Sequence, residues 1–160
     1  MGFRYAVIGS GRQGTSAAYD LARFGDAEYL LLADQSLAQA DRAAARVNQL
    51  IGRQVAHAVQ VEVQNEDAVV SMLTGAAIEV LISGVPYFYN LGLTRAALRA
   101  HASMCDFGGN TDTCSSWRAR YGHHSHYCVS LTAINGRQKR HNLAAPRNFH
   151  AHTARIKPLP

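Results

Sequence analysis

The chain has 160 residues, of which 48% are hydrophobic and 17% are charged. This composition is typical of a globular domain that buries its own core, and it argues against an intrinsically disordered protein. The longest apolar run near the start is too short for a membrane span or a secretory leader, so we expect a cytoplasmic protein with no membrane partner. Three cysteines argue against a disulfide framework.

The net charge of +5 is unevenly distributed. Residues 1–112 contain 8 Lys and Arg against all 11 acidic residues, which gives −3. Residues 113–160 contain the other 8 Lys and Arg and no acidic residue, which gives +8. The chain is therefore predicted to consist of a folded domain, residues 1–112, and an irregular basic tail, residues 113–160.

The folded part begins with alternating strand and helix patterns. Arg4–Gly9 is an apolar run bounded by glycine, which predicts a buried strand. A helix is expected from about Gln13 to Phe24, ending at Gly25, because its apolar residues, Phe24 included, have helical spacing. Glu28–Asp34 is the second predicted strand.

Ser36 is an N-cap candidate for the next helix, and Gly52 marks its end. Its expected buried face consists of Leu37, Ala40, Ala44, Val47 and Leu50.

Three more strands and two helices are predicted after Gly52. In chain order they are strand Val55–Val63, helix Asn65–Gly75, strand 78–86, helix Asn90–His101 and strand Ser103–Gly109. Alternation of strands and helices with short connections is typical of a parallel sheet covered on both faces. The predicted fold class is therefore α/β, with an incomplete, doubly wound (Rossmann-type) sheet.

The segment GSGRQG places Gly9, Gly11 and Gly14 between the first strand and the first helix. In a dinucleotide site these glycines allow a tight turn, approach of the backbone to a pyrophosphate, and close packing of helix on strand. Amides at the helix start then bind the phosphates. The candidate phosphate-binding residues are Gly9, Ser10, Gly11, Arg12, Gln13 and Gly14.

Asp34 ends the second strand, where a carboxylate accepts hydrogen bonds from the adenosine ribose. Its charge would repel a 2′-phosphate, and Gln35 and Ser36 supply no arginine, so NAD is favoured. Arg12 can offset that preference, which leaves NADP as the alternative cofactor. The competing interpretation is an ordinary glycine turn followed by an aspartate that caps the next helix.

Two further loops leave the predicted carboxyl edge of the sheet. In the segment SGVPYFYN, Ser83 would bring backbone close to the nicotinamide ribose, and Val85 and Pro86 would form a wall beside it. The tyrosines of this segment are expected to belong to the core. In DFGGNTD, the polar candidates are Asp106, Asn110 and Asp112, with a plain glycine-rich loop as the alternative.

A family resemblance is carried by three segments: VIGSGRQGTSAAYDLAR, LLADQSLAQA and VLISGVPYFYNLGLTRAALRAHASMCDFGGNTD. They resemble the N-terminal NAD(P)-binding domain of the saccharopine dehydrogenase family, and in particular its bacterial branch of lysine 6-dehydrogenase-like enzymes. The resemblance implies NAD(P)-linked oxidation of the C–N bond of an amino acid, as in lysine metabolism. It also implies that Asn110 and Asp112 lie near a domain junction.

Residues 113–160 show none of the substrate domain that follows in this family, so this chain is expected to be inactive and to bind dinucleotide only. The abrupt loss of acidic residues favours a truncation or a reading-frame shift after about residue 112. The alternative is a stand-alone nucleotide-binding module whose basic arm binds nucleic acid or a protein partner. Of these two partners, nucleic acid is disfavoured.

No metal site is predicted, because the spacing of Cys114, His123, His124, His126 and Cys128 fits no usual zinc motif. No catalytic residue is assigned, and a homodimer stays open through the free edge of the sheet.

Overall fold

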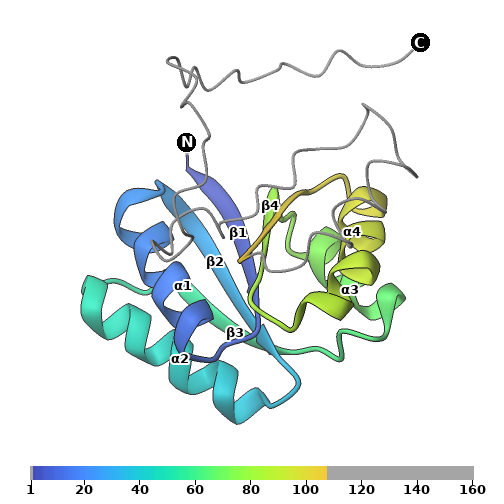
Figure 1. Ribbon diagram of the computed structural model, residues 1–160. Helices are drawn as coiled ribbons and strands as arrows, with labels where there is room; N and C mark the ends of the chain where they lie inside the picture. Colours follow the sequence, from blue (N-terminus) through green and yellow to red (C-terminus); the bar gives the residue numbers. More distant parts are fainter. Residues whose placement is uncertain (1, 108–160) are drawn as a thin grey trace, which may run out of the picture.

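The computed structural model describes residues 2–107, which form a five-stranded sheet. Helices cover the sheet (Figure 1). The strand order is β3-β2-β1-β4-β5, and all four neighbouring pairs are parallel. This order confirms the predicted doubly wound α/β fold. In chain order the elements are β1 (Phe3–Ile8), α1 (Arg12–Phe24), β2 (Ala27–Asp34), α2 (Leu37–Ile51), β3 (Ala56–Gln60), α3 (Glu66–Gly75), β4 (Val80–Ser83), the 3-10 helix η1 (Tyr87–Tyr89), α4 (Asn90–Arg99) and β5 (Ser103–Asp106).

The core has two layers because successive side chains of a strand point to opposite faces of the sheet. In β1, Val7 faces the layer formed with α1 and α2, and Ile8 faces the layer formed with α3 and α4. Alanines dominate the α1 and α2 side, which lets both helices approach the sheet closely. None of the helices in residues 2–107 is long and apolar enough to cross a membrane.

Both predicted boundaries of α2 are confirmed. The Ser36 hydroxyl accepts a hydrogen bond from the Gln39 amide at 3.4 Å, which caps the first turn. Gly52 ends the helix in the left-handed region, with φ of +73°.

Three predicted strands are longer than the strands observed. Val55–Val63 shortens to β3, 78–86 to β4, and Ser103–Gly109 to β5. The reason lies in the register, since Gln60 pairs with Asp34, the last residue of β2, and Ser83 pairs with Ile8, the last residue of β1. The strands therefore stop together, and the loops leave the sheet at one common edge.

The apolar faces predicted for α1 and α2 are correct in the middle of each helix and wrong at the ends. Ala40, Ala44 and Val47 are buried, whereas Leu37 and Leu50 are about half exposed. Phe24, the last residue of α1, is 73% exposed. Each helix packs on the sheet through its central turns, so apolar residues at its ends extend beyond the layer they were expected to join.

Candidate functional site

The centre of the sheet is a topological switch point, because β1 pairs with β2 on one side and with β4 on the other. Gly9 follows β1 with a φ of +95°, a conformation that favours glycine. A Cβ on Gly9 would lie 2.8 Å from the backbone of Gly84, which follows β4. The Gly84 amide in turn donates to the Ile8 carbonyl at 2.7 Å. The two loops therefore touch through backbone atoms, at the place where doubly wound sheets bind ligands.

Gly14 and Gly11 meet different surroundings. A Cβ on Gly14 would lie 1.8 Å from the Gly9 carbonyl oxygen, so this glycine is needed for helix α1 to pack against the turn. A Cβ on Gly11 would meet no described atom within 4 Å, so it would project into open space at the start of α1. The structure thus separates a packing role for Gly14 from a surface at Gly11 that a ligand can approach.

The first turn of α1 presents amides that lack intrahelical partners, as at every helix N-terminus. Gly11 is the N-cap and has no side chain to cap them, and the first turn contains no acidic residue. Arg12 and Gln13 are exposed there. The amides and the positive end of the helix dipole make this turn suited to a phosphate group.

Asp34 is half-buried at the end of β2, and both of its carboxylate oxygens accept backbone hydrogen bonds. Oδ2 accepts from the Ser10 amide at 2.8 Å, and Oδ1 accepts from the Ser36 amide at 3.0 Å. The carboxylate is therefore fixed beside the glycine turn, as the ribose hypothesis requires. It also caps the loop before α2, so the alternative interpretation of Asp34 describes part of its role.

Ser10 is fully buried, and its hydroxyl donates to the Ala33 carbonyl at 3.3 Å. Its amide donates to Asp34, as described above, so both of its donors point into the protein. Within the predicted phosphate-binding segment, Ser10 supports the turn and presents neither donor to a ligand.

A cavity of about 340 Å³ lies beside Asp34, between the ends of β2 and β3 and helix α3. Its lining residue Val61 is bonded to Asp34, because the Val61 amide donates to the Asp34 carbonyl at 2.9 Å. Sequence reasoning identified only Gln35 in this region, although the apolar pair at i and i+4 in α3 was a visible signal. The lining residues are Gln35, Gln60, Val61, Glu62, Ala68 and Met72.

At the end of β4, three buried polar side chains bond to one another. The Ser83 hydroxyl donates to the Asn90 side-chain oxygen at 2.7 Å, and the Asn90 amide donates to Asp106 at 2.8 Å. The chain of bonds joins the ends of β4 and β5 to the first turn of α4. Ser83 and Asp106, both predicted near the crevice, are brought together here as supports of the following loop.

The loop after β4 differs from the prediction in its aromatic residues. Tyr87 and Phe88 are 46% and 62% exposed, and Tyr89 is half-buried, so the tyrosines do not belong to the core. They form a short 3-10 helix on the outside of the loop and contact one another through their rings. Val85 is half-buried and Pro86 is exposed at the same edge of the sheet.

The chain matches the family model described as saccharopine dehydrogenase NADP binding domain over residues 5–148. The chain belongs to this family. It carries the NAD(P)-binding domain of a saccharopine-dehydrogenase-type oxidoreductase, and the expected family resemblance is confirmed. The match continues past residue 112, so the domain boundary drawn there from charge stays a prediction.

Solved structures share the fold of this NAD(P)-binding domain. Apo saccharopine dehydrogenase (L-Glu forming) from Saccharomyces cerevisiae matches with a TM-score of 0.56 at 19% identity, over 72% of this chain and 24% of that chain. UDP-glucose-4-epimerase from Stenotrophomonas maltophila, with bound NAD, matches with a TM-score of 0.56 at 15% identity, over 68% of this chain and 39% of that chain. L-sorbose reductase from Gluconobacter frateurii, complexed with NADPH and L-sorbose, matches with a TM-score of 0.53 at 16% identity, over 66% of this chain and 52% of that chain.

These identities are low, so the structural matches show the fold alone. The chain spans about a quarter of the length of the saccharopine dehydrogenase that it matches. No curated protein sequence gave a significant match.

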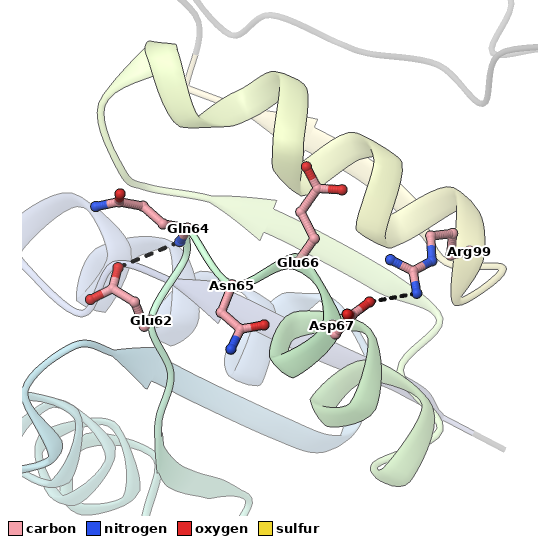
Figure 2. A pocket seen from close by; sticks show the side chains of 6 residues that line it. All are labelled: Glu62, Gln64, Asn65, Glu66, Asp67 and Arg99. Atoms are coloured by element: carbon pink, nitrogen blue, oxygen red, sulfur yellow. Dashed lines mark hydrogen bonds and ion pairs between the residues drawn. The ribbon is translucent and has the colours of Figure 1, made fainter.

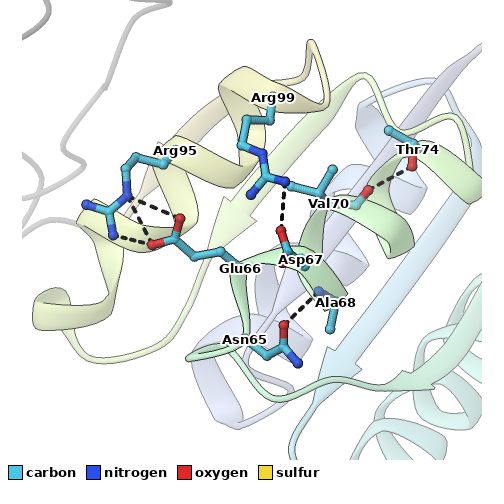
Figure 3. A network of polar contacts seen from close by, with 8 residues as sticks. All are labelled: Asn65, Glu66, Asp67, Ala68, Val70, Thr74, Arg95 and Arg99. Atoms are coloured by element: carbon cyan, nitrogen blue, oxygen red, sulfur yellow. Dashed lines mark hydrogen bonds and ion pairs between the residues drawn. The ribbon is translucent and has the colours of Figure 1, made fainter.

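A larger cavity of about 640 Å³ lies by the loop from β3 to α3 and reaches α4 (Figure 2). Two of its acidic side chains, Glu66 and Asp67, are paired with arginines of α4 (Figure 3). Glu66 forms a two-pronged ion pair with Arg95, and Asp67 accepts from Arg99 at 2.7 Å. Hydrogen bonding to Arg95 lowers the pKa of Glu66. We assign this network to the attachment of α3 to α4.

Several predicted site residues lie outside the described part of the chain. They are Asn110, Asp112 and the cysteines and histidines of residues 113–160, together with the predicted basic arm. Within residues 2–107, no group of three or more His, Cys, Asp or Glu side chains is arranged to hold a metal ion.

Proposed function

We propose that this domain binds NAD across the carboxyl edge of its sheet, as the cofactor-binding part of an oxidoreductase acting on the C–N bond of an amino acid. The observation that carries the proposal is the switch point, where Gly9 touches Gly84 and leaves the approach to Gly11 open. The family match and the fold support a nicotinamide dinucleotide as the ligand.

Each part of the dinucleotide has a complementary surface. The pyrophosphate would lie on the amides of the first turn of α1, where the helix dipole favours negative charge. The adenosine ribose would hydrogen-bond to Asp34, whose oxygens keep lone pairs beyond the two already used. The adenine would occupy the cavity of about 340 Å³, between polar Gln35 and apolar Met72.

The preference for NAD over NADP rests on Asp34. Its carboxylate is held in place by two backbone amides, so it cannot easily turn away from a 2′-phosphate. Two negative charges about 5 Å apart repel by about 3 kcal/mol at the effective dielectric of a protein surface. Exposed Arg12 lies on α1 and provides partial compensation.

The nicotinamide would lie against the loop after β4, with Val85 and Pro86 as its wall. The bound cofactor would accept a hydride from the carbon that carries the amine, as the family chemistry implies. The described residues would orient the cofactor on one side. We propose that lysine or a related amino acid is the substrate of the whole enzyme, in the cytoplasm, and that this chain alone binds dinucleotide without turnover.

Titration of the purified 160-residue chain with NADH and with NADPH tests the proposal through the fluorescence of the reduced nicotinamide. We expect saturable binding of both, with NADH tighter, and no reduction of NAD when lysine or saccharopine is added. Absence of binding of either dinucleotide at about 1 mM, the upper end of ordinary enzyme affinities, would overturn the proposal. Turnover would refute the claim of inactivity and leave the binding site intact.

A further inference from the structure

The Ser10–Gly11 peptide sets the direction in which the first amide of the phosphate site points. In a trans peptide the carbonyl and the N–H point in opposite directions. The Ser10 carbonyl accepts from the Gln39 side-chain amide at 2.8 Å and from the Thr15 hydroxyl at 3.2 Å. The Gly11 N–H is therefore directed away from these two donors, and within residues 2–107 it has no acceptor.

Gln39 lies in the first turn of α2, and its own orientation is fixed. Arg42 donates to the Gln39 side-chain oxygen at 2.7 Å. Because a guanidinium only donates, the oxygen of Gln39 must face Arg42 and its nitrogen must face the Ser10 carbonyl. Gln39 is half-buried beside the turn, and its backbone amide is bound by Ser36.

These bonds connect the ribose side of the site to the phosphate side. Asp34 binds the amides of Ser10 and Ser36, and Gln39 binds the carbonyl of the same Ser10. Without Gln39, only the Thr15 hydroxyl would keep the Ser10 carbonyl turned inward. An inverted peptide would point a carbonyl dipole at the phosphate position and withdraw an N–H donor from it.

We propose that Gln39 is a positioning residue of the dinucleotide site: it holds the Ser10–Gly11 peptide so that the Gly11 N–H faces the pyrophosphate. Gln39 is not placed to touch the ligand itself. This inference rests on the proposed function, since it assigns a phosphate to the space in front of Gly11.

The matched variants are Gln39→Leu and Gln49→Leu in the full 160-residue chain. Gln49 lies in the same helix and also accepts from an arginine three residues away, Arg46, but it is exposed and far along the helix from the turn. Both substitutions remove a neutral amide and leave the net charge unchanged. Thermal unfolding is recorded for each, and binding is measured well below the unfolding temperature.

We expect Gln39→Leu to weaken NADH binding about fivefold, the effect of one neutral hydrogen bond on the population of the competent turn. Gln49→Leu should bind as the parent chain does. In the NMR spectrum of the free protein, the Gly11 amide signal should shift or broaden in Gln39→Leu and stay unchanged in Gln49→Leu. The second variant Thr15→Val, which removes the other donor to Ser10, should weaken binding in the same way.

Unchanged affinity in Gln39→Leu, or equal weakening in both glutamine variants, would overturn the inference. If the parent chain binds neither NADH nor NADPH, the proposed function fails, and the Gly11 amide signal then decides the positioning role by itself. A Gly11 signal that is identical in all variants would refute it.

Discussion

Substitution by alanine is expected to lower the stability of the domain at Gly14 and the affinity for the dinucleotide at Gly11. Gly14→Ala places a Cβ 1.8 Å from the Gly9 carbonyl oxygen, whereas Cβ contacts in proteins essentially never fall below 3.0 Å. Helix α1 and the turn must separate by more than 1 Å, because neither atom belongs to a flexible side chain. Overpacking of this kind costs about 3 kcal/mol, and the better helix propensity of alanine offsets about 1 kcal/mol of it.

The net loss of about 2 kcal/mol in Gly14→Ala corresponds to a Tm lower by about 10 °C for a domain of this size. Gly11→Ala adds its Cβ in open space, at a φ of −72° that any residue adopts, and should cost less than about 1 kcal/mol as an N-cap exchange. Its effect should appear in binding, where a methyl group between the backbone and the pyrophosphate weakens NADH binding about tenfold.

Circular dichroism during heating measures the first effect, and NADH titration at 20 °C or below measures the second. The parent chain is the reference for both variants. If Gly11→Ala kept full affinity, or if it lost as much stability as Gly14→Ala, the separation of packing and binding roles would be wrong.

Three further predictions concern single groups. Asp34→Asn should shift the ratio of NADH to NADPH affinity toward NADPH by about a hundredfold, because about 3 kcal/mol of repulsion of a 2′-phosphate disappears; an unchanged ratio would remove Asp34 as the selector. Glu66→Gln should lower the free energy of unfolding by less than about 1 kcal/mol at pH 7, since its pair with Arg95 is partly exposed. The pKa of Glu66 is below its ordinary value of 4.5, so the stabilisation by the ion pair is present above pH 4.5 and is lost as the pH falls through the lower pKa of the folded state. At that low pH, the free energies of unfolding of the parent chain and of Glu66→Gln, measured with denaturant, should become equal. Burial, with a smaller effect from Asp106, raises the pKa of the Cys105 thiol to about 11. Alkylation of Cys105 should therefore be slow at pH 8 and become faster up to about pH 11, because only the thiolate reacts. Peptide mass spectrometry measures the extent of alkylation at each pH.

Much of the fold could be predicted from local patterns. Glycines at turns, the Ser36 cap and the alternation of strands with helices each depend on residues close in sequence, and the structure confirms them. Exposure at the ends of elements could not be predicted, because it depends on how far a helix extends beyond the sheet. Leu37, Leu50 and Phe24 fit the helical spacing as well as any buried residue, yet the layer ends before it reaches them.

The site was predictable where a backbone requirement selects a residue type. Gly9 needs a positive φ, and Gly14 needs the absence of a Cβ, so both leave a signal in the sequence. The inward role of Ser10 and the contact from Gln39 depend on side-chain directions set by the packing of two helices. No spacing in the chain encodes that contact, since a glutamine at this position is ordinary on a helix surface.

The position of β4 has a consequence for the order of folding. Only α1 lies between β1 and β2 in the sequence, whereas β1 and β4, which pair on the other side of β1, are separated by α2, β3 and α3 as well. Closing the longer loop costs more entropy, so we expect the contact between Gly9 and Gly84 to form late. In pulse-labelled hydrogen exchange, the Gly84 amide should gain protection after the amides that join β1 to β2, and simultaneous protection would contradict this order. A dinucleotide would then bind only to chains in which β1 and β4 have already paired. Its binding would stabilise the domain only after this last step of folding.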